Sequence, residues 1–377
     1  MRRVGQLAIT TGLFLLAGSI GWNAGLRAAE PSNSAASHLP RADFHSQTVL
    51  KSIAFGSCSK QDKPQPIWEA IVAKQPDLFI YMGDNIYGDT DDMNVLREKW
   101  NLQKNLPGYD QLRKTCPVIA TWDDHDYGRN DAGAEYPFKR ESQQLFLDFL
   151  DEPADSPRRT REGVYASYLY GPAGRQVHVI LLDTRFFRSP LKSMRNTSPP
   201  AEGITGPYVN DPHPAGEMLG AEQWTWLEGQ LRIPAALKVI VSSIQLIPDE
   251  HGWEKWANLL PQREKFLQLL EQTQAEGVIV LSGDRHASEF SRLPRESQYD
   301  LWDVTCSSLN QARAYQNELN RFRVGLMYSE VNFGMLLLDW EQSDPELTMQ
   351  ICGETGRPML QVRIPLSDLK IGAQRKE

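Results

Sequence analysis

Short apolar runs alternate with longer, partly polar segments along the chain from residue 52 onward. The runs are rich in Val, Ile and Leu, as buried strands are, and they predict strands at Ser52–Phe55, Leu78–Met82, Val118–Trp122, His178–Leu182, Val239–Ser243 and Val278–Leu281. The segments between them predict helices at Pro66–Lys74, Asn94–Trp100, Ser142–Leu150, Glu222–Leu231 and Arg263–Glu276. A closing antiparallel pair is predicted at Phe333–Asp339 and Leu347–Ile351. Strands that alternate with helices indicate an α/β fold with largely buried sheets.

No clean linker interrupts residues 52–364, so we predict one catalytic domain over residues 49–377. Residues 188–218 are rich in Pro, Gly, Asn and Ser, and a loop of this length is more often functional or mobile than core. The net charge of −8 argues against a broad nucleic-acid-binding surface. It is compatible with clustered carboxylates that hold cations. Composition gives no indication of the oligomeric state.

Residues 1–29 have the pattern of a secretory signal, and residues 30–48 that of a flexible lead-in. Arg2 and Arg3 precede an apolar run, which is followed by small residues. Arg27 makes the cleavage site imperfect, so an uncleaved amino-terminal anchor is the alternative. No later stretch approaches ~18 consecutive apolar residues, the length of a membrane span. We therefore expect an exported protein, periplasmic or extracellular, that is either released or tethered at one end.

Chemistry-bearing residues follow four of the predicted strands. They are Cys58 after the first strand, Asp84 and Tyr87 after the second, Asp123, Asp124, His125 and Asp126 after the third, and Asp284 and His286 after the sixth. In open α/β sheets ligands bind beyond the carboxyl ends of the strands, so side chains placed there can share one site. Carboxylates crowded at one strand end repel one another unless cations, arginines or water neutralise them.

Each of these signals has an ordinary structural explanation when it stands alone. A Gly-Asp pair at a strand end is commonly a turn whose carboxylate caps backbone amides. A lone Cys58 is more often a buried hydrophobe or half of a disulfide, and the four cysteines are too few for a disulfide framework. Four such strand ends together point instead to a metal or hydrolytic site.

The motifs that carry the site residues are Gly56-Ser-Cys58, Gly83-Asp-Asn-Ile-Tyr87, Trp122-Asp-Asp-His-Asp-Tyr-Gly-Arg-Asn-Asp131 and Ser282-Gly-Asp-Arg-His286. Further short motifs are Leu181-Leu-Asp-Thr-Arg185, Ser242-Ser-Ile-Gln245 and Trp253-Glu-Lys-Trp256. With this set the chain resembles the alkaline phosphatase D-like branch of the calcineurin-like metallophosphatases, a specific resemblance although each motif alone is weak. The resemblance implies a four-layer α-β-β-α sandwich with two mixed sheets. It also implies hydrolysis of phosphate monoesters, diesters or both.

The resemblance implies a set of metal ligands, namely Cys58, Asp84, Tyr87, Asp124, Asn130, Asp284 and His286. Asp84 is expected to bridge cations, and Tyr87 matches the position of the family's tyrosine ligand to iron. Asp124 takes the position of an Asn ligand in the wider superfamily, with Asp123 as its rival or support. We expect two or more metal ions, with iron, calcium or both implied and zinc or manganese open. A Cys58 thiolate suits iron or zinc better than calcium.

The remaining roles concern the substrate, which is expected to be a small phosphate ester. His125 is expected to be catalytic, contacting the leaving-group oxygen without binding metal. Arg129 and Arg185 are expected to hold phosphate oxygens. The expected reaction is attack by a metal-bound hydroxide in line with the bond that breaks, at a site with metals about 3.5–4 Å apart.

Two functions without turnover remain as alternatives. One is a metal-loaded binding protein, against which the intact His125 argues, because pure binding needs no acid there. The other is a structural protein stabilised by Ca²⁺ through acidic loops such as Asp89-Thr-Asp-Asp92. The longer family members carry an extra amino-terminal domain before the cysteine motif. Few residues precede Cys58 here, so we expect a more open pocket, and the substrate preference of those relatives does not carry over.

Overall fold

A six-stranded sheet contains the first three predicted strands, side by side. The computed structural model describes residues 44–194, 204–314 and 318–373. The sheet has the order β14 (Pro358–Pro365), β13 (Glu346–Gly353), β12 (Asn332–Asp339), β2 (Ser52–Gly56), β3 (Leu78–Met82) and β4 (Val118–Thr121). β2, β3 and β4 are parallel, and β12, β13 and β14 extend the sheet in antiparallel pairing. The carboxyl ends of β2, β3 and β4 therefore lie at one edge.

The second sheet has eight strands. Its order is β1 (Phe44–Ser46), β5 (Ala166–Tyr170), β6 (Val177–Leu181), β7 (Leu237–Val241), β8 (Val278–Ser282), β10 (Leu301–Thr305), β9 (Ser288–Leu293) and β11 (Arg323–Tyr328). β6, β7, β8 and β10 are parallel, whereas β5 and β9 run antiparallel to their neighbours β6 and β10. Both sheets are therefore mixed.

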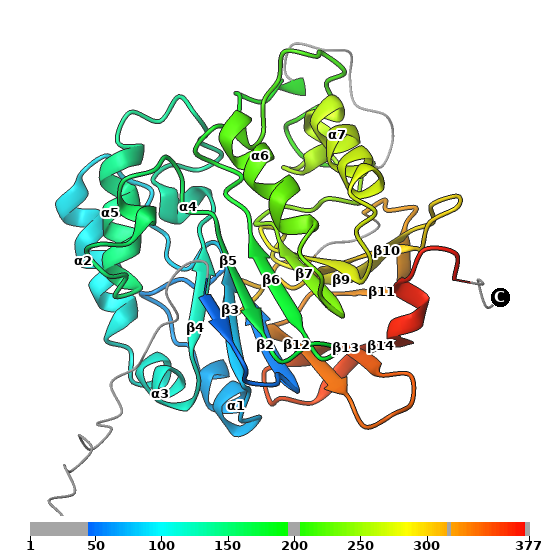
Figure 1. Cartoon of the computed structure of the whole chain (residues 1–377). Coiled ribbons are helices and arrows are strands. Elements are labelled where there is room, and N and C mark those ends of the chain that lie inside the picture. The colour runs from blue at the N-terminus through cyan, green and yellow to red at the C-terminus, as the bar shows by residue number, and fades with distance from the viewer. Residues whose placement is uncertain (1–43, 195–203, 315–317, 374–377) are drawn as a thin grey trace, which may run out of the picture. The chain divides into compact units, whose positions relative to one another are not determined.

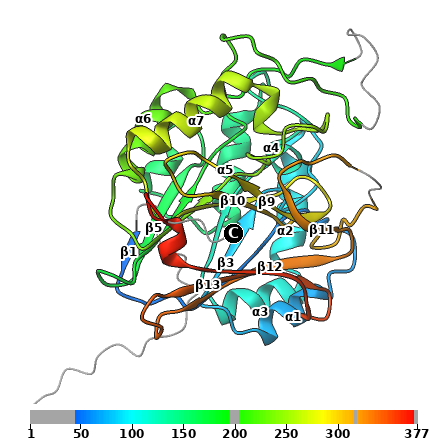
Figure 2. The same ribbon diagram turned by 90° about the vertical axis from the view of Figure 1, so that its right-hand side faces the viewer.

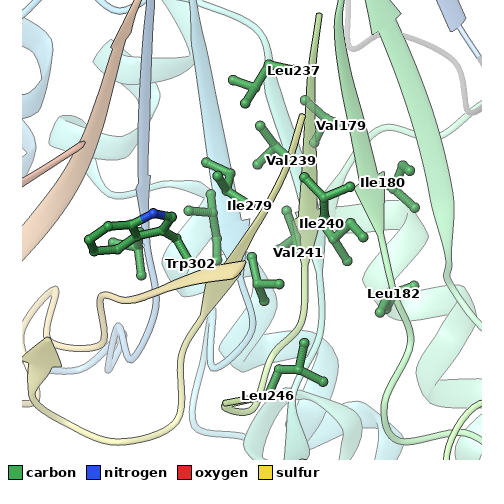
Figure 3. Packing of buried hydrophobic residues seen from close by; sticks show 14 of the residues in the cluster. Val179, Ile180, Leu182, Leu237, Val239, Ile240, Val241, Leu246, Ile279 and Trp302 are labelled. Carbon is green, nitrogen blue, oxygen red and sulfur yellow. The ribbon is translucent and has the colours of Figure 1, made fainter. Parts of the chain in front are cut away.

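Side chains of β3 alternate between two hydrophobic clusters. Leu78, Ile80 and Met82 belong to a cluster that also contains residues of β6, β7 and β8, so this face of β3 points toward the other sheet. Phe79 and Tyr81 belong to a second cluster, which contains residues of the helices. Such period-two alternation is expected of a strand that is buried on both faces. Figure 3 shows aliphatic side chains of β6 and β7 in the first of these clusters, which also contains residues of α6 (Gly220–Leu231) and α7 (Leu260–Gln272).

Helices cover the outer face of each sheet. α1 (Ile67–Ala73), α2 (Met93–Lys104), α3 (Pro107–Thr115) and α5 (Lys139–Phe149) pack on the six-stranded sheet, and α6 (Gly220–Leu231) and α7 (Leu260–Gln272) on the eight-stranded one. Figures 1 and 2 show α6 and α7 on one side of the two sheets, with α1 and α3 on the opposite side. The predicted four-layer sandwich with two mixed sheets is confirmed.

Several strands escaped prediction because their buried residues are polar. In β9, Glu289 is buried and binds Arg323, and in β10 the buried Asp303 accepts hydrogen bonds from the amides of Leu246 and Ile247. Periodicity does not reveal such partners, because they come from distant parts of the chain. β1, β5, β11, β14 and α3 were also not predicted, whereas the antiparallel pair β12 and β13 was.

The predicted signal segment, residues 1–29, lies outside the described residues, as does most of the lead-in. Within the described part of the chain, no helix has the length and apolar character that crossing a membrane requires.

Candidate metal centre

The candidate ligands come from the strand ends of both sheets. Cys58 follows β2 and Asp84 follows β3 in the six-stranded sheet, whereas Asp284 and His286 follow β8 in the other. Ligand atoms of Cys58, Asp84 and His286 all lie within 4.8 Å of one another. The same holds for a carboxylate group made of Asp84, Asp123, Asp124 and Asp284. The two sheets therefore bring these side chains to one shared site.

Four of these residues have a backbone conformation that non-glycine residues rarely adopt. The φ angles of Cys58, Asp84, Asp284 and His286 are 60°, 50°, 68° and 55°. Such conformations cost on the order of 1–3 kcal/mol each and cluster at functional sites, where the surrounding structure enforces them. Their concentration at three strand ends indicates that side-chain placement here outweighs local backbone stability.

Cys58, Tyr87 and His286 surround one oxygen of Asp84. The Cys58 thiol and the Tyr87 hydroxyl each donate to Asp84 Oδ2 at 3.3 Å. The Tyr87 hydroxyl also lies 2.8 Å from His286 Nε2, and Ser307 Oγ lies 3.0 Å from Cys58 Sγ. Cys58 and Tyr87 thus lie within hydrogen-bonding distance of Asp84, and His286 joins this group through Tyr87.

This group holds its protons tightly when no cation is bound. Burial raises the pKa of the Cys58 thiol to about 12, and it raises the pKa of Asp84 and of Tyr87 well above their usual values. Asp84 Oδ1 and Asp123 Oδ2 are buried with no hydrogen-bond partner among the described residues. A bound cation would satisfy these oxygens and favour the deprotonated ligands. The donor set therefore fits metal ions.

Asp123 and Asp124 are adjacent in sequence but have different surroundings. Asp124 accepts hydrogen bonds from the backbone amides of His125, at 2.9 Å, and Asp131, at 2.6 Å. Although burial alone would raise the pKa of Asp124, the charges of His125 and Arg185 lower it below its usual value. Asp123 instead accepts from Arg185, and burial outweighs that charge and raises its pKa to about 6. Asp124 therefore stays ionised and faces the site.

Arg185 lies behind the carboxylates. It is completely buried, with Nη2 2.5 Å from Asp123 Oδ1 and Nη1 2.7 Å from Glu254 Oε2. Arg188, also buried, approaches Glu254 at 3.1 Å. The guanidinium of Arg185 thus balances acidic side chains in the interior. Its predicted contact with substrate phosphate gains no support from this placement.

His125 is held by a neighbouring carboxylate. Its Nδ1 lies 2.7 Å from Asp89 Oδ1, and its ring packs on Tyr87 with the centroids 4.2 Å apart. Although burial lowers the pKa of His125, the charges of Asp124, Asp84 and Asp89 together raise it to about 11. Because Nδ1 is hydrogen-bonded to Asp89, Nε2 is the ring nitrogen that can exchange a proton with a substrate.

A pocket opens over this cluster. Of the two predicted site residues not yet described, Asn130 and Arg129, only Asn130 lines it. The pocket lining consists of Asp124, His125, Asn130, Asp131, Tyr208, Trp253, Glu254, Asp284, Arg285, His286 and Arg313. Asn130 is therefore beside the ligand cluster. Arg129 is exposed, binds Asp91 through its guanidinium and lies over the Tyr136 ring.

Sequence reasoning assigned no role to Glu254, Asp131 or Arg313. Glu254 and Asp131 form a further possible metal-binding group with Asp124. Glu254 lies in the Trp253-Glu-Lys-Trp256 motif, which was the only signal available for it. All four cysteines are free and buried, so no disulfide joins them.

Several solved structures have the same fold. A structure of PhoD aligns with a TM-score of 0.64 at 16% identity, covering 85% of this chain and 69% of that one. The purple acid phosphatase PPD1 from yellow lupin (Lupinus luteus) seeds aligns with a TM-score of 0.53 at 11% identity, covering 85% of this chain and 54% of that one. GAP50, the anchor in the inner membrane complex of Plasmodium, also gives 0.53, at 13% identity, covering 84% and 89% of the two chains. The chain therefore has the metallophosphatase fold.

Residues 90–335 match the family model described as PhoD-like phosphatase, and the chain belongs to that family. Alkaline phosphatase D of Bacillus subtilis (strain 168) is 24% identical over 281 residues, which cover 64% of this chain and 46% of the relative. The chain thus spans less than half the length of this relative. The predicted resemblance is confirmed, and so is membership of a phosphatase family. The metal identities and individual ligand roles stay predictions.

Proposed function

We propose that the protein is a metal-dependent phosphoesterase that hydrolyses small phosphate esters. The observation that carries the proposal is the position of Asp84. One of its oxygens, Oδ2, faces Cys58 and Tyr87, whereas Oδ1 is buried without a hydrogen-bond partner among the described residues. Asp84 also belongs to two possible metal-binding groups, one with Cys58 and one with other carboxylates, as a carboxylate that could bridge two cations would.

The two ligand groups differ in chemistry. On one side of Asp84 lie Cys58, Tyr87 and His286, a sulfur, a phenol oxygen and an imidazole that suit iron or zinc. On the other side lie Asp124 and Asp284, whose oxygens suit a harder cation such as calcium or manganese. Two unlike cations would therefore fit here, with Asp84 a candidate ligand in both groups.

The chain's own residues then bind and orient the ester. Metal ions bound here would supply a water molecule of lowered pKa and polarise the phosphoryl oxygens. His125 donates its Nε2 proton to the leaving-group oxygen, while Asp89 holds Nδ1 and fixes the orientation of the ring. Arg185 keeps Asp123 in place by pairing with it in the interior.

Binding without turnover is the competing function, because one fold supports different functions. The calcium-stabilised form of this alternative relied on the acidic run that starts at Asp89. Each carboxylate there has a protein partner, since Asp89 binds His125, Asp91 binds Arg129 and Asp92 caps α2. These contacts favour an acid-base role for His125 over a calcium loop.

The test is hydrolysis of aryl phosphate monoesters and diesters side by side, together with metal analysis of the purified protein. A chelator is expected to abolish turnover, and added metal to restore it. Asp84→Asn is expected to lose both metal and turnover. Asp110→Asn, at an exposed carboxylate paired with Lys114, is the matched control and is expected to change neither. Steady turnover after exhaustive chelation would overturn the proposal.

We further propose export, which the amino-terminal sequence pattern supports. Cell fractionation and amino-terminal sequencing of the mature protein test this. Full-length protein found only in the cytoplasm would contradict it.

A further inference from the structure

Two arginine side chains lie over one tryptophan ring at the pocket. The guanidinium carbons of Arg285 and Arg313 are 5.5 Å and 5.3 Å from the centroid of the Trp253 ring. These distances are in the range of cation–π contacts, which orient a planar guanidinium. All three residues line the pocket that contains His125.

The two arginines differ in their environment. Arg285 is 3% exposed, and its Nη2 donates to both carboxylate oxygens of Glu318, at 2.7 and 2.6 Å. The guanidinium of Arg285 is therefore paired with the carboxylate of Glu318. Arg313 is exposed, and its backbone amide donates to the carbonyl of His286 at 2.9 Å. This bond fixes the main chain of Arg313 beside a candidate metal ligand, while its side chain lies at the solvent end of the pocket.

Exposure gives the direction in which a substrate would lie. Cys58 and Asp84 at the metal cluster are completely buried or nearly so, whereas Arg313 is exposed. A phosphoryl group held at the cluster therefore directs its leaving group past His125 and toward the mouth. Arg313 is then placed to meet the leaving group and not the phosphoryl group that is cleaved.

We propose that Arg313, oriented by Trp253, binds a second anionic group on the leaving-group side of the substrate. The enzyme then prefers phosphate esters whose leaving group carries a carboxylate or a further phosphate. A guanidinium pairs with either anion through two parallel hydrogen bonds. This inference rests on the proposed function and names the substrate class of the same site.

A pair of nearly isosteric substrates tests the inference. The metal-loaded protein is assayed with para-carboxyphenyl phosphate and para-carbamoylphenyl phosphate, and the ratio of their kcat/KM values is measured. Arg313→Gln is expected to lower this ratio about threefold to thirtyfold relative to wild type, the range for a charge pair at a partly exposed site. Arg313→Lys is expected to retain part of the preference. Arg232→Gln, at an exposed arginine paired with Glu228 on α6, is the control and is expected to leave the ratio unchanged.

Binding is measured separately, with benzylphosphonates that carry the same para groups and cannot be hydrolysed. The carboxylate compound is expected to lose affinity in Arg313→Gln, and the amide compound is not. If Arg313→Gln weakens both compounds and both substrates equally, Arg313 contacts the transferred phosphoryl group, and the inference is overturned. An unchanged ratio overturns it too. Absence of turnover together with Arg313-dependent phosphonate binding would contradict the proposed function alone.

Discussion

Replacing Asp89 with Asn is expected to shift the pH dependence of turnover without removing metal. The Asp89 carboxylate lies 2.7 Å from Nδ1 of the His125 ring, and an Asn side chain can still accept that hydrogen bond. His125 must carry its proton to act as an acid, so turnover falls as the pH rises through its pKa. Because the negative charge of Asp89 raises that pKa, its removal moves the basic limb of the profile to lower pH.

The size of the shift follows from the exposure of the pair. The side chains of His125 and Asp89 are 16% and 43% exposed, so solvent screens much of their attraction. A charge pair at this separation is worth about 1–1.5 kcal/mol in a water-like medium, which corresponds to about one pKa unit. Metal ions at Asp84 and Asp124 would lower the pKa of His125 in both proteins and leave the direction of the difference unchanged.

The assay is the pH profile of kcat for an aryl phosphate, with metal content measured in parallel. Asp91→Asn is the matched control, since Asp91 lies in the same segment but binds Arg129. It is expected to leave the limb in place. His125→Ala is expected to retain metal and lose about 10²–10⁴-fold in kcat. An unshifted basic limb in Asp89→Asn, or loss of metal in His125→Ala, would refute the assigned roles.

Three further predictions concern the metal ligands and the buried charges. Cys58→Ser is expected to lower the metal content, because a serine hydroxyl does not replace a thiolate as a soft ligand, and an unchanged metal content would contradict ligation. If ferric iron is bound, Tyr87 is expected to give a visible charge-transfer band; a band that survives in Tyr87→Phe would exclude this ligand. Arg185→Met is expected to lower the free energy of unfolding, measured in urea, by about 3–5 kcal/mol, because it leaves buried carboxylates unpaired. Arg232→Met is the surface control, and equal stability of the two variants would argue against the buried pair.

The fold could be predicted from sequence because its central strands are apolar and follow a simple order. The predicted segment Leu78–Met82 matches β3, and Val278–Leu281 lies within β8. The same pattern placed Asp84 and Asp284 at strand ends, where the structure has them. Motif resemblance then supplied the ligand types, and the structure brings Cys58, Tyr87 and His286 around Asp84.

What sequence reasoning left open depends on contacts between distant segments. Asp123 and Asp124 were rivals, because adjacent carboxylates carry the same local signal. Their difference arises from Arg185, which reaches Asp123 across 62 positions of the chain. Glu254 lay in a short motif that assigned it no role, since its pairing with Arg185 and Arg188 depends on the fold. Charge pairs between distant segments do not produce a periodic pattern of hydrophobic residues, so a sequence pattern does not reveal them.

Glycines explain why these Gly-Asp turns form a site and are not ordinary turns. A Cβ at Gly83 would lie 2.5 Å from Cβ of Asp123, and a Cβ at Gly283 would lie 2.5 Å from Oγ of Ser57. The first contact packs the loop after β3 against that after β4, and the second packs the loop after β8 against that after β2. Both separations are shorter than real Cβ contacts, so a side chain at either position would push the loops apart. The close approach of the two sheets at the site therefore depends on Gly283, and that of the β3 and β4 loops within one sheet depends on Gly83.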